Sequence, residues 1–156
     1  MSAWSTAVRS APVAADAGYE VDFYAWTMEQ AKLIRDGAFE TLDRDNLAEE
    51  IESWGREQFA KLESAFRVLL MHMLKWDYQP ARRTRSWALT IAEQRLRVGN
   101  VLSDNPSLVA RREDAAARAY RLARIGAARE TGLDLASFPE ANPYAFGDMT
   151  DRPFEI

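Results

Sequence analysis

Apolar side chains recur every three or four residues over most of this chain, which is the spacing of one face of an α-helix. The first such stretch runs from Asp22 to Arg35 and places Trp26 and Leu33 on one apolar stripe. Asp22 can cap the free backbone amides at the start, and Gly37 suits the left-handed conformation that ends many helices. The pattern therefore predicts a helix over residues 22–35.

A second, longer helical pattern begins after Asp43 or Asp45 and ends at Asp77, before Pro80. An unbroken helix there has about 30 residues and is roughly 45–50 Å long. Gly55 weakens it, and we expect this glycine to mark close helix packing or a bend. Because residues 66–76 are apolar on most of the circumference, this part should form the centre of a bundle. The predicted stripe consists of Leu47, Ile51, Trp54, Leu62, Ala65, Leu69, Met73 and Trp76.

Two further helices and an irregular end complete the pattern. The third helix is predicted from Ser86 or Trp87 to about Leu102, and the fourth from the start signal at Asn105-Pro106 to about Glu130. The expected core residues of the fourth helix are Leu108, Ala115, Ala119, Leu122 and Ile125. In the final segment, the residues expected to pack back on the bundle are Leu133, Leu135, Phe138, Tyr144 and Phe146.

No stretch has the alternating pattern of a β-strand. The prediction is an all-α fold: a four-helix bundle with one long central helix and an irregular C-terminal strap. Residues 1–18 are expected to be a flexible lead-in, and residues 19–156 a single helical domain.

Composition narrows the classes of function. The 156 residues include no cysteine, which excludes disulfides, thiolate zinc sites and a thiol nucleophile and fits a reducing cytoplasm. The longest purely apolar run, Val68 to Met71, is far shorter than the ~20 residues that span a bilayer. The first residues also lack the apolar core of a signal peptide. We expect a cytoplasmic protein without a membrane partner.

Charge is distributed unevenly along the chain, although the net charge is only −4. Residues 16–63 contain thirteen acidic and five basic side chains, whereas residues 82–129 contain eleven arginines against four acids. The basic segment could form a face for an anionic partner. Acidic and basic helices could equally pack side by side and neutralise each other, and we favour this second interpretation.

Acidic and polar side chains near the start of the second helix share one helical face, since they are three, four and seven residues apart. They are Asn46, Glu49, Glu50 and Ser53. A di-metal site in a helical bundle also needs Glu-x-x-His pairs, and the chain has none. Glu50 and His72 would be about 33 Å apart on one straight helix. We therefore expect surface acids that complement the helix dipole, with no metal and no cofactor.

His72 is the only histidine and lies in an apolar stretch. A neutral imidazole in such a place usually makes structural hydrogen bonds. Its pKa near neutrality also makes it a possible acid–base group, but no nucleophile motif accompanies it. We assign no catalytic residue.

The turn after the second helix combines aromatic side chains with arginines. Together with His72, its candidate binding residues are Trp76, Tyr78, Gln79, Arg82, Arg83, Arg85 and Trp87. Such a composition is typical of phosphate or nucleic-acid sites and of protein-interaction hot spots. Alternatively, the tryptophans anchor the core while the arginines cap the helix and pair with acids. No glycine-rich phosphate loop or HExxH motif is present.

These blocks resemble a known bacterial family, domain-of-unknown-function family 29. The similar segments are DFYAWTMEQAKLIRDGAFETLDRDNLAEEIES, VLLMHMLKWDYQPARRTRSWALTIAEQR, DNPSL and ETGLDLASFPEANPY, which extend from about Tyr19 to Tyr144. The resemblance implies a small helical bacterial protein. It implies no catalytic residues, because the family has no established activity.

Three hypotheses follow. The leading one is a non-enzymatic interaction or oligomerisation module that binds itself or a partner protein. The second is nucleic-acid binding through the arginine-rich turn and the fourth helix. The third, which we do not favour, is an enzyme that depends on a carboxylate–metal site or on His72.

Overall fold

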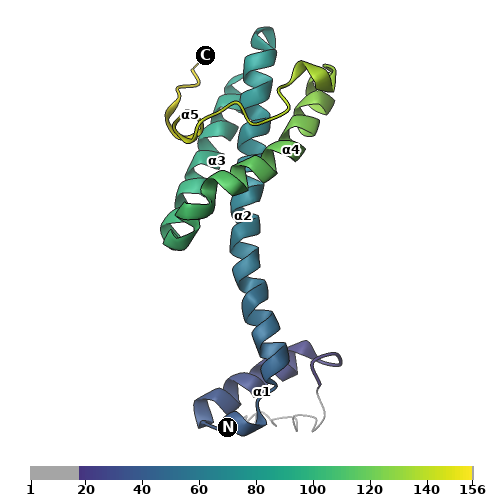
Figure 1. The fold of residues 1–156 in the computed structure, drawn as a ribbon, viewed down its shortest axis with the longest axis vertical. Coiled ribbons are helices and arrows are strands. Elements are labelled where there is room, and N and C mark those ends of the chain that lie inside the picture. The colour runs from purple at the N-terminus through teal and green to yellow at the C-terminus, as the bar shows by residue number, and fades with distance from the viewer. Residues whose placement is uncertain (1–17, 156) are drawn as a thin grey trace, which may run out of the picture. The chain divides into compact units, whose positions relative to one another are not determined.

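The computed structural model describes residues 18–155, and the lead-in predicted over residues 1–18 lies almost entirely outside them. The described chain is helical and contains no strand, so the all-α prediction is confirmed (Figure 1). Its α-helices are α1 (Phe23–Asp36), α2 (Arg44–Tyr78), α3 (Arg85–Asp104), α4 (Arg112–Thr131) and α5 (Phe146–Asp151). Short 3-10 helices span Phe39–Thr41, Pro80–Arg82, Pro106–Arg111 and Leu135–Ser137.

Local signals set the helix ends. The Asp22 side chain accepts a hydrogen bond from the amide of Ala25 at the start of α1, and Gly37 ends that helix with φ of 74°. Thr84 caps α3 in the same way as Asp22 caps α1, and Gly132 ends α4 with φ of 72°. The predicted boundaries of α1 and α3 and the predicted end of α4 are therefore confirmed to within a few residues. The predicted start of α4 was wrong, because the turn from Pro106 to Arg111 is a 3-10 helix and α4 begins only at Arg112.

The long central helix α2 has 35 residues and continues through Gly55. A Cβ atom at Gly55 would meet no other atom within 4 Å, so this glycine does not serve close helix packing. The helix ends at Tyr78, and Pro80 opens the 3-10 helix that follows. The proline acts as predicted, because it cannot donate the backbone hydrogen bond that would extend α2.

Residue contacts divide the chain into two units, one extending to Glu52 and one beginning at Ser53. The first contains α1 and the start of α2, and we call it the N-terminal unit. The second contains the remainder of α2 with α3, α4 and α5, and we call it the C-terminal unit. The two units are described separately below.

A small polar and aromatic centre holds the N-terminal unit together. The indole Nε1 of Trp26 donates to Asp43 Oδ2 at 3.1 Å, and the backbone amide of Asp43 donates to Gln30 Oε1 at 2.9 Å. Trp26 and Gln30 are buried, and the Tyr19 ring meets the Trp26 ring edge-on. Ile51, which we predicted to be part of a core stripe, is instead 62% exposed. The prediction that Ile51 belongs to the core was wrong, because no further α-helix of the described N-terminal unit covers this side chain.

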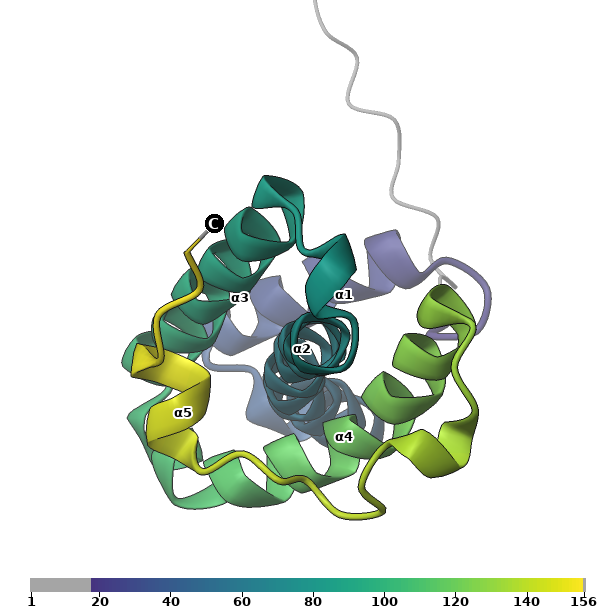
Figure 2. The ribbon, with the colours of Figure 1, turned by 90° about the horizontal axis from the view of Figure 1, so that it is seen from above.

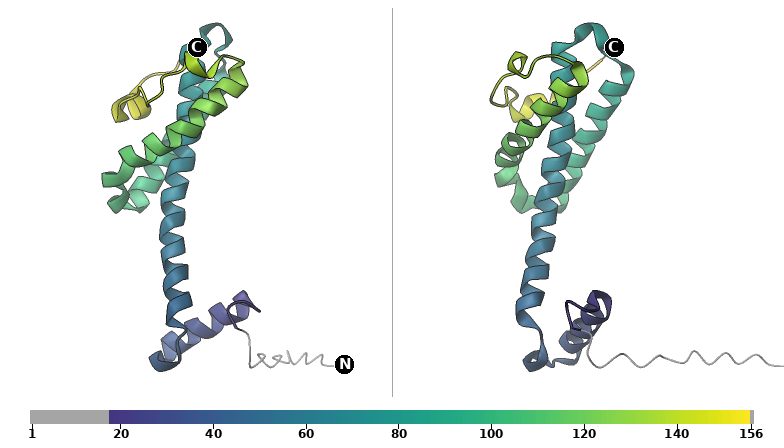
Figure 3. Two further views of the ribbon diagram at one scale, coloured as in Figure 1. Left: turned by 45° about the vertical axis from the view of Figure 1, so that its right-hand side comes forward. Right: turned by 90° about the vertical axis from the view of Figure 1, so that its right-hand side faces the viewer.

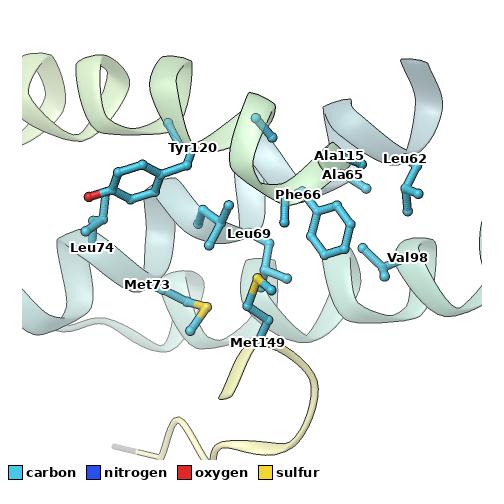
Figure 4. Packing of buried hydrophobic residues seen from close by; sticks show 14 of the residues in the cluster. Leu62, Ala65, Phe66, Leu69, Met73, Leu74, Val98, Ala115, Tyr120 and Met149 are labelled. Carbon is cyan, nitrogen blue, oxygen red and sulfur yellow. The ribbon is translucent and has the colours of Figure 1, made fainter. Parts of the chain in front are cut away.

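In the C-terminal unit, α3 and α4 flank the later half of α2 (Figures 2 and 3). Leu62, Phe66, Leu69, Met73 and neighbouring residues of α2 form its core and are fully or almost fully covered (Figure 4). The strongly apolar stretch of α2 is thus central, as its sequence predicts. Trp54, nearer the start of this unit, is 63% exposed, so its prediction as a core residue was wrong.

The core side of α4 differs from the prediction. Leu122 and Ile125 are 61% and 53% exposed rather than buried. Small side chains and one tyrosine face the core instead: Ala115, Ala116, Ala119, Tyr120, Ala123 and Ala127. Alanines let α4 approach α2 closely, whereas the larger side chains at Leu122 and Ile125 would hold the helices apart.

The C-terminal strap packs on the core, as expected, and ends in the short helix α5 that the sequence did not predict (Figure 2). Phe138 is buried, and Leu133, Tyr144 and Phe146 pack against the core cluster. Leu135 is 40% exposed, so its predicted packing was wrong.

Within residues 18–155, none of the helices has both the length and the apolar character needed to cross a bilayer.

Candidate interaction surfaces

The aromatic–arginine turn is largely a structural joint. Trp76 is buried and meets the Phe154 ring edge-on, with the ring centroids 5.4 Å apart. The Arg83 guanidinium lies over the same indole, and its Nε donates to the Trp76 carbonyl oxygen at 2.9 Å. Arg83 therefore satisfies a free carbonyl at the end of α2, as the structural alternative predicted.

Trp87 takes part in a charge cluster around the buried Lys75. The Lys75 ammonium lies 4.5 Å from the Trp87 ring centroid, and its Nζ donates to Glu130 Oε2 at 2.6 Å. This hydrogen bond from Lys75 lowers the pKa of Glu130. Sequence reasoning did not select Lys75 or Glu130, although a lysine inside an apolar helical run signals that its ammonium group needs an acidic partner.

His72 lies one helical turn before Trp76 and is half-buried. Its Nδ1 is 2.9 Å from the carbonyl oxygen of Val68, so Nδ1 carries the proton and donates it. Burial lowers the pKa of His72, with a contribution from the positive charge of Lys75. The geometry thus gives His72 a structural hydrogen bond and favours its neutral form.

The neighbouring residues of α2 hold the C-terminal strap. Asp77 accepts a hydrogen bond from the Tyr144 hydroxyl at 2.8 Å, and both its oxygens accept from Arg152. Burial opposes ionisation of Asp77, but the hydrogen bonds from Arg152 and Tyr144 outweigh it and lower the pKa. Burial and the Asp77 contact raise the pKa of Tyr144. No local pattern marks this cluster, because its members are far apart in sequence.

Tyr78 and Gln79 also make internal contacts. The Tyr78 ring packs on Phe138 at 4.9 Å between centroids, and Gln79 Nε2 donates to the carbonyl oxygen of Thr131 at 2.8 Å. These contacts join the end of α2 to the strap and to the end of α4.

Arg82 and Arg85 are the two turn residues left available to a partner. Both are exposed, and neither side chain has a hydrogen bond or ion pair within residues 18–155. The structure therefore does not gather the predicted candidates into one site. Six of them belong to the packing of the C-terminal unit, and these two face solvent.

The polar residues at the start of α2 have separate roles. Asn46 Nδ2 donates to Asp43 Oδ2 at 2.7 Å, and Glu50 accepts from the Tyr19 hydroxyl. This contact with Glu50 raises the pKa of Tyr19 to about 12. Glu49 is exposed. In the described part of the chain, no three His, Cys, Asp or Glu side chains are grouped where they could hold one metal ion.

An arginine-lined hollow lies between α2 and α4. Its volume is about 230 Å³, and its lining comprises Glu63, Ser64, Arg67, Arg118, Ala119 and Leu122. A neighbouring hollow of about 470 Å³ shares Glu63 and Arg118 and also includes Phe59 and Arg111. The Arg111 guanidinium lies 4.0 Å from the Phe59 ring centroid. This side of the C-terminal unit therefore combines apolar surface with positive charge.

The N-terminal unit exposes several large apolar side chains. Val21 is 81% exposed and Tyr24 is 74% exposed. The other exposed large apolar side chains of this unit are Phe23, Met28, Ile34, Phe39 and Ile51. Single exposed apolar residues are ordinary, but larger exposed apolar surfaces are typical of interaction sites.

These features define a small all-helical protein with one apolar, acidic unit and one unit that carries exposed arginines. The chain belongs to the family described as domain of unknown function DUF29, whose model matches residues 19–155. The resemblance found in the sequence is thereby confirmed. Neither the curated proteins nor the solved structures include one that matches the chain.

Proposed function

We propose that this protein is a non-enzymatic interaction module that associates with itself through the apolar surface of its N-terminal unit. The observation that carries the proposal is the exposure of Val21, Tyr24, Met28 and Ile51, each more than half accessible. The absence of cysteine also supports a cytoplasmic location.

Burial of this surface would drive association. Removing apolar area from water contributes about 25 cal/mol per Å², so covering several aromatic and aliphatic side chains can offset the entropy lost on association. Tyr24 and Met28 are four residues apart in α1 and therefore share one face of the helix. A partner can cover both side chains without unfolding any part of α1.

Size-exclusion chromatography with light scattering tests the proposal. The chain should exceed its monomer mass of 17.7 kDa as the concentration rises. Tyr24→Ser combined with Met28→Ser should return it to the monomer mass, because the variant removes the apolar face of α1. Leu89→Ser with Leu96→Ser is the matched control, since both leucines are exposed on α3. A constant 17.7 kDa at every concentration would contradict self-association.

Nucleic-acid binding is a second candidate function. The observation that favours it is the exposure of Arg82 and Arg85 without an ion-pair partner within residues 18–155. Arginine forks bind phosphate oxygens, and such binding weakens steeply with salt. Fluorescence anisotropy with single- and double-stranded DNA and RNA at ~50 mM salt tests it. Absence of binding under these low-salt conditions would remove this candidate.

A further inference from the structure

We propose that the outer face of α4, together with Arg67 of α2, is the docking surface for the acidic N-terminal unit of a second copy of the chain. This inference rests on the proposed self-association and names the surface that receives the partner. We call it the α4 face and define it by Arg67, Arg118, Arg121, Leu122, Ile125 and Arg129.

The α4 face has a two-residue apolar centre within a ring of arginines. Arg118, Leu122, Ile125 and Arg129 follow each other at intervals of four, three and four residues, which aligns them along one side of α4. Leu122 and Ile125 are 61% and 53% exposed. The core of the C-terminal unit is complete without them, because alanines and Tyr120 fill the inner side of the helix.

Beneath the α4 face, α2 and α4 are closely packed. A Cβ atom built on Gly126 would lie 2.7 Å from Sδ of Met71, so α2 and α4 are in close contact beside Ile125. The hollow of about 230 Å³ next to Leu122 is lined by Arg67 and Arg118. A partner side chain can enter this hollow while the surrounding arginines contact its acidic neighbours.

Most of the positive charge on the α4 face is not neutralised within the described C-terminal unit. Arg118 has an ion pair with Glu63, at 3.4 Å. Arg67, Arg121 and Arg129 are exposed and have no carboxylate within ion-pair distance in the described chain. These three guanidinium groups can therefore pair with a partner's carboxylates without first breaking an internal bridge.

The N-terminal unit offers the complementary chemistry. Its described residues, 18–52, contain ten acidic and three basic side chains, a net charge of −7. Residues 53–155 contain sixteen basic and thirteen acidic side chains, a net charge of +3. Asp45 and Glu49 are exposed one turn apart on the same side of α2. These exposed carboxylates match the exposed arginines of the α4 face in charge.

The aliphatic centre favours a protein partner over a nucleic acid. Nucleic-acid surfaces commonly present aromatic rings on which bases stack, whereas Leu122 and Ile125 offer no ring. Apolar side chains surrounded by arginines are typical of the centre and rim of a protein interface.

A second copy of the chain can be the partner, because each chain carries both the acidic N-terminal unit and the α4 face. If each chain receives the acidic unit of the other, the same contact is made twice and two-fold symmetry closes the dimer. Closure leaves neither surface exposed for further growth. Charge complementarity also sets the orientation, since two acidic units would repel each other.

Charge reversal tests this assignment. Arg121→Glu combined with Arg129→Glu should weaken dimerisation at least about tenfold, because attraction becomes repulsion at two exposed pairs. Arg82→Glu with Arg85→Glu changes the net charge equally but lies outside the α4 face, and it should leave the dimer intact. Light scattering over a concentration series measures the dimerisation of both variants. Circular dichroism checks that each variant is folded.

A complementary pair of variants makes the test specific. Asp45→Arg with Glu49→Arg should also weaken self-association when studied alone. Mixed in equal amounts with the Arg121→Glu, Arg129→Glu chain, it should form a mixed dimer of twice 17.7 kDa. Combining all four substitutions in one chain should restore a homodimer.

The outcomes separate this inference from the proposed function. If the Arg121, Arg129 variant dimerises like the Arg82, Arg85 control while the Tyr24, Met28 variant is monomeric, self-association stands and the α4 face is overturned. If the Arg121→Glu, Arg129→Glu variant loses oligonucleotide binding while its dimerisation is unchanged, the α4 face is a nucleic-acid surface instead. If the wild-type chain stays monomeric, both proposals fall.

Discussion

At the scale of single residues, Asp77 shows how one buried carboxylate can organise a distant segment. It accepts hydrogen bonds from Tyr144 and Arg152, which are 67 and 75 residues away in sequence. The sequence could not reveal this cluster, because neither partner has a fixed spacing to α2. By contrast, the cap at Asp22 was predicted from the sequence, since it bonds an amide only three residues away. Thr84 caps α3 over the same short spacing, although the sequence analysis did not select it.

Replacing Asp77 with asparagine should destabilise the fold. The amide is uncharged and leaves the half-buried guanidinium of Arg152 without its counter-charge, so we expect a loss of about 1–3 kcal/mol in the free energy of unfolding. Urea denaturation followed by circular dichroism measures it. Asp104→Asn, at an exposed position, is the control and should change stability by less than about 0.5 kcal/mol. Equal stability of the two variants would show that the strap does not depend on Asp77.

The same carboxylate predicts an acid dependence of stability. Its folded pKa lies below its usual value of 3.8, so the unfolded state binds the proton more readily. The contribution of Asp77 is therefore present above about pH 4 and is lost as pH falls through the folded pKa. Urea midpoints measured from pH 6 downward should fall more steeply for the wild type than for Asp77→Asn. Parallel curves would contradict this assignment.

His72 provides a residue-scale test that needs no variant for assignment, because the chain has one histidine. Burial lowers its pKa, so the imidazole in the folded protein should titrate below the usual 6.5. Stability linked to His72 is full above that value and declines as pH falls through the folded pKa. Proton NMR of the imidazole follows the titration directly. A midpoint at or above 6.5 in the folded protein would contradict the burial described for His72.

At the scale of elements, helix existence was easier to predict than the orientation of each helix. Capping residues, Pro80 and the two left-handed glycines act locally and set the ends of the helices. The inner side of α4 depends on how closely α2 approaches, and alanines allow an approach that leucine and isoleucine prevent. Size alone therefore selected Leu122 and Ile125 wrongly as core residues, and both are instead exposed.

Two helical glycines should respond differently to alanine. At Gly99 in α3, an alanine methyl group would lie in open space, with no atom within 4 Å. Gly99→Ala should therefore raise the free energy of unfolding by about 0.5–1 kcal/mol through helix propensity. Gly126→Ala should gain less, because its Cβ would displace Met71. Thermal melts compare the two, and a larger gain at Gly126 would contradict the close approach of α2 and α4.

At the scale of the whole molecule, the charge asymmetry of the sequence corresponds to two structural units with opposite net charge. The sequence predicted the asymmetry and also the alternative that basic helices pair with acids inside the fold. The structure supplies the missing detail: Arg83 binds a carbonyl and Arg118 binds Glu63, whereas Arg67, Arg121 and Arg129 are exposed. This distinction depends on packing and could not be made from the order of residues.

If oppositely charged surfaces hold two copies together, added salt should weaken the dimer. Screening shortens the reach of exposed charges to about 3 Å at 1 M salt, from about 10 Å at 0.1 M. We expect the dissociation constant to rise between these conditions, with a smaller rise for Arg121→Glu, Arg129→Glu because it has fewer attractions to lose. Dilution experiments by isothermal titration calorimetry at each salt concentration measure the dissociation constant of the dimer. Dimerisation that strengthens with salt would indicate an interface formed by apolar contacts alone.

The central claim is that this chain associates with itself, and sedimentation velocity over a wide concentration range tests it most directly. The account predicts a species of 17.7 kDa at low concentration that is replaced by one of twice that mass as concentration rises. A single species of 17.7 kDa across the whole range would contradict the claim.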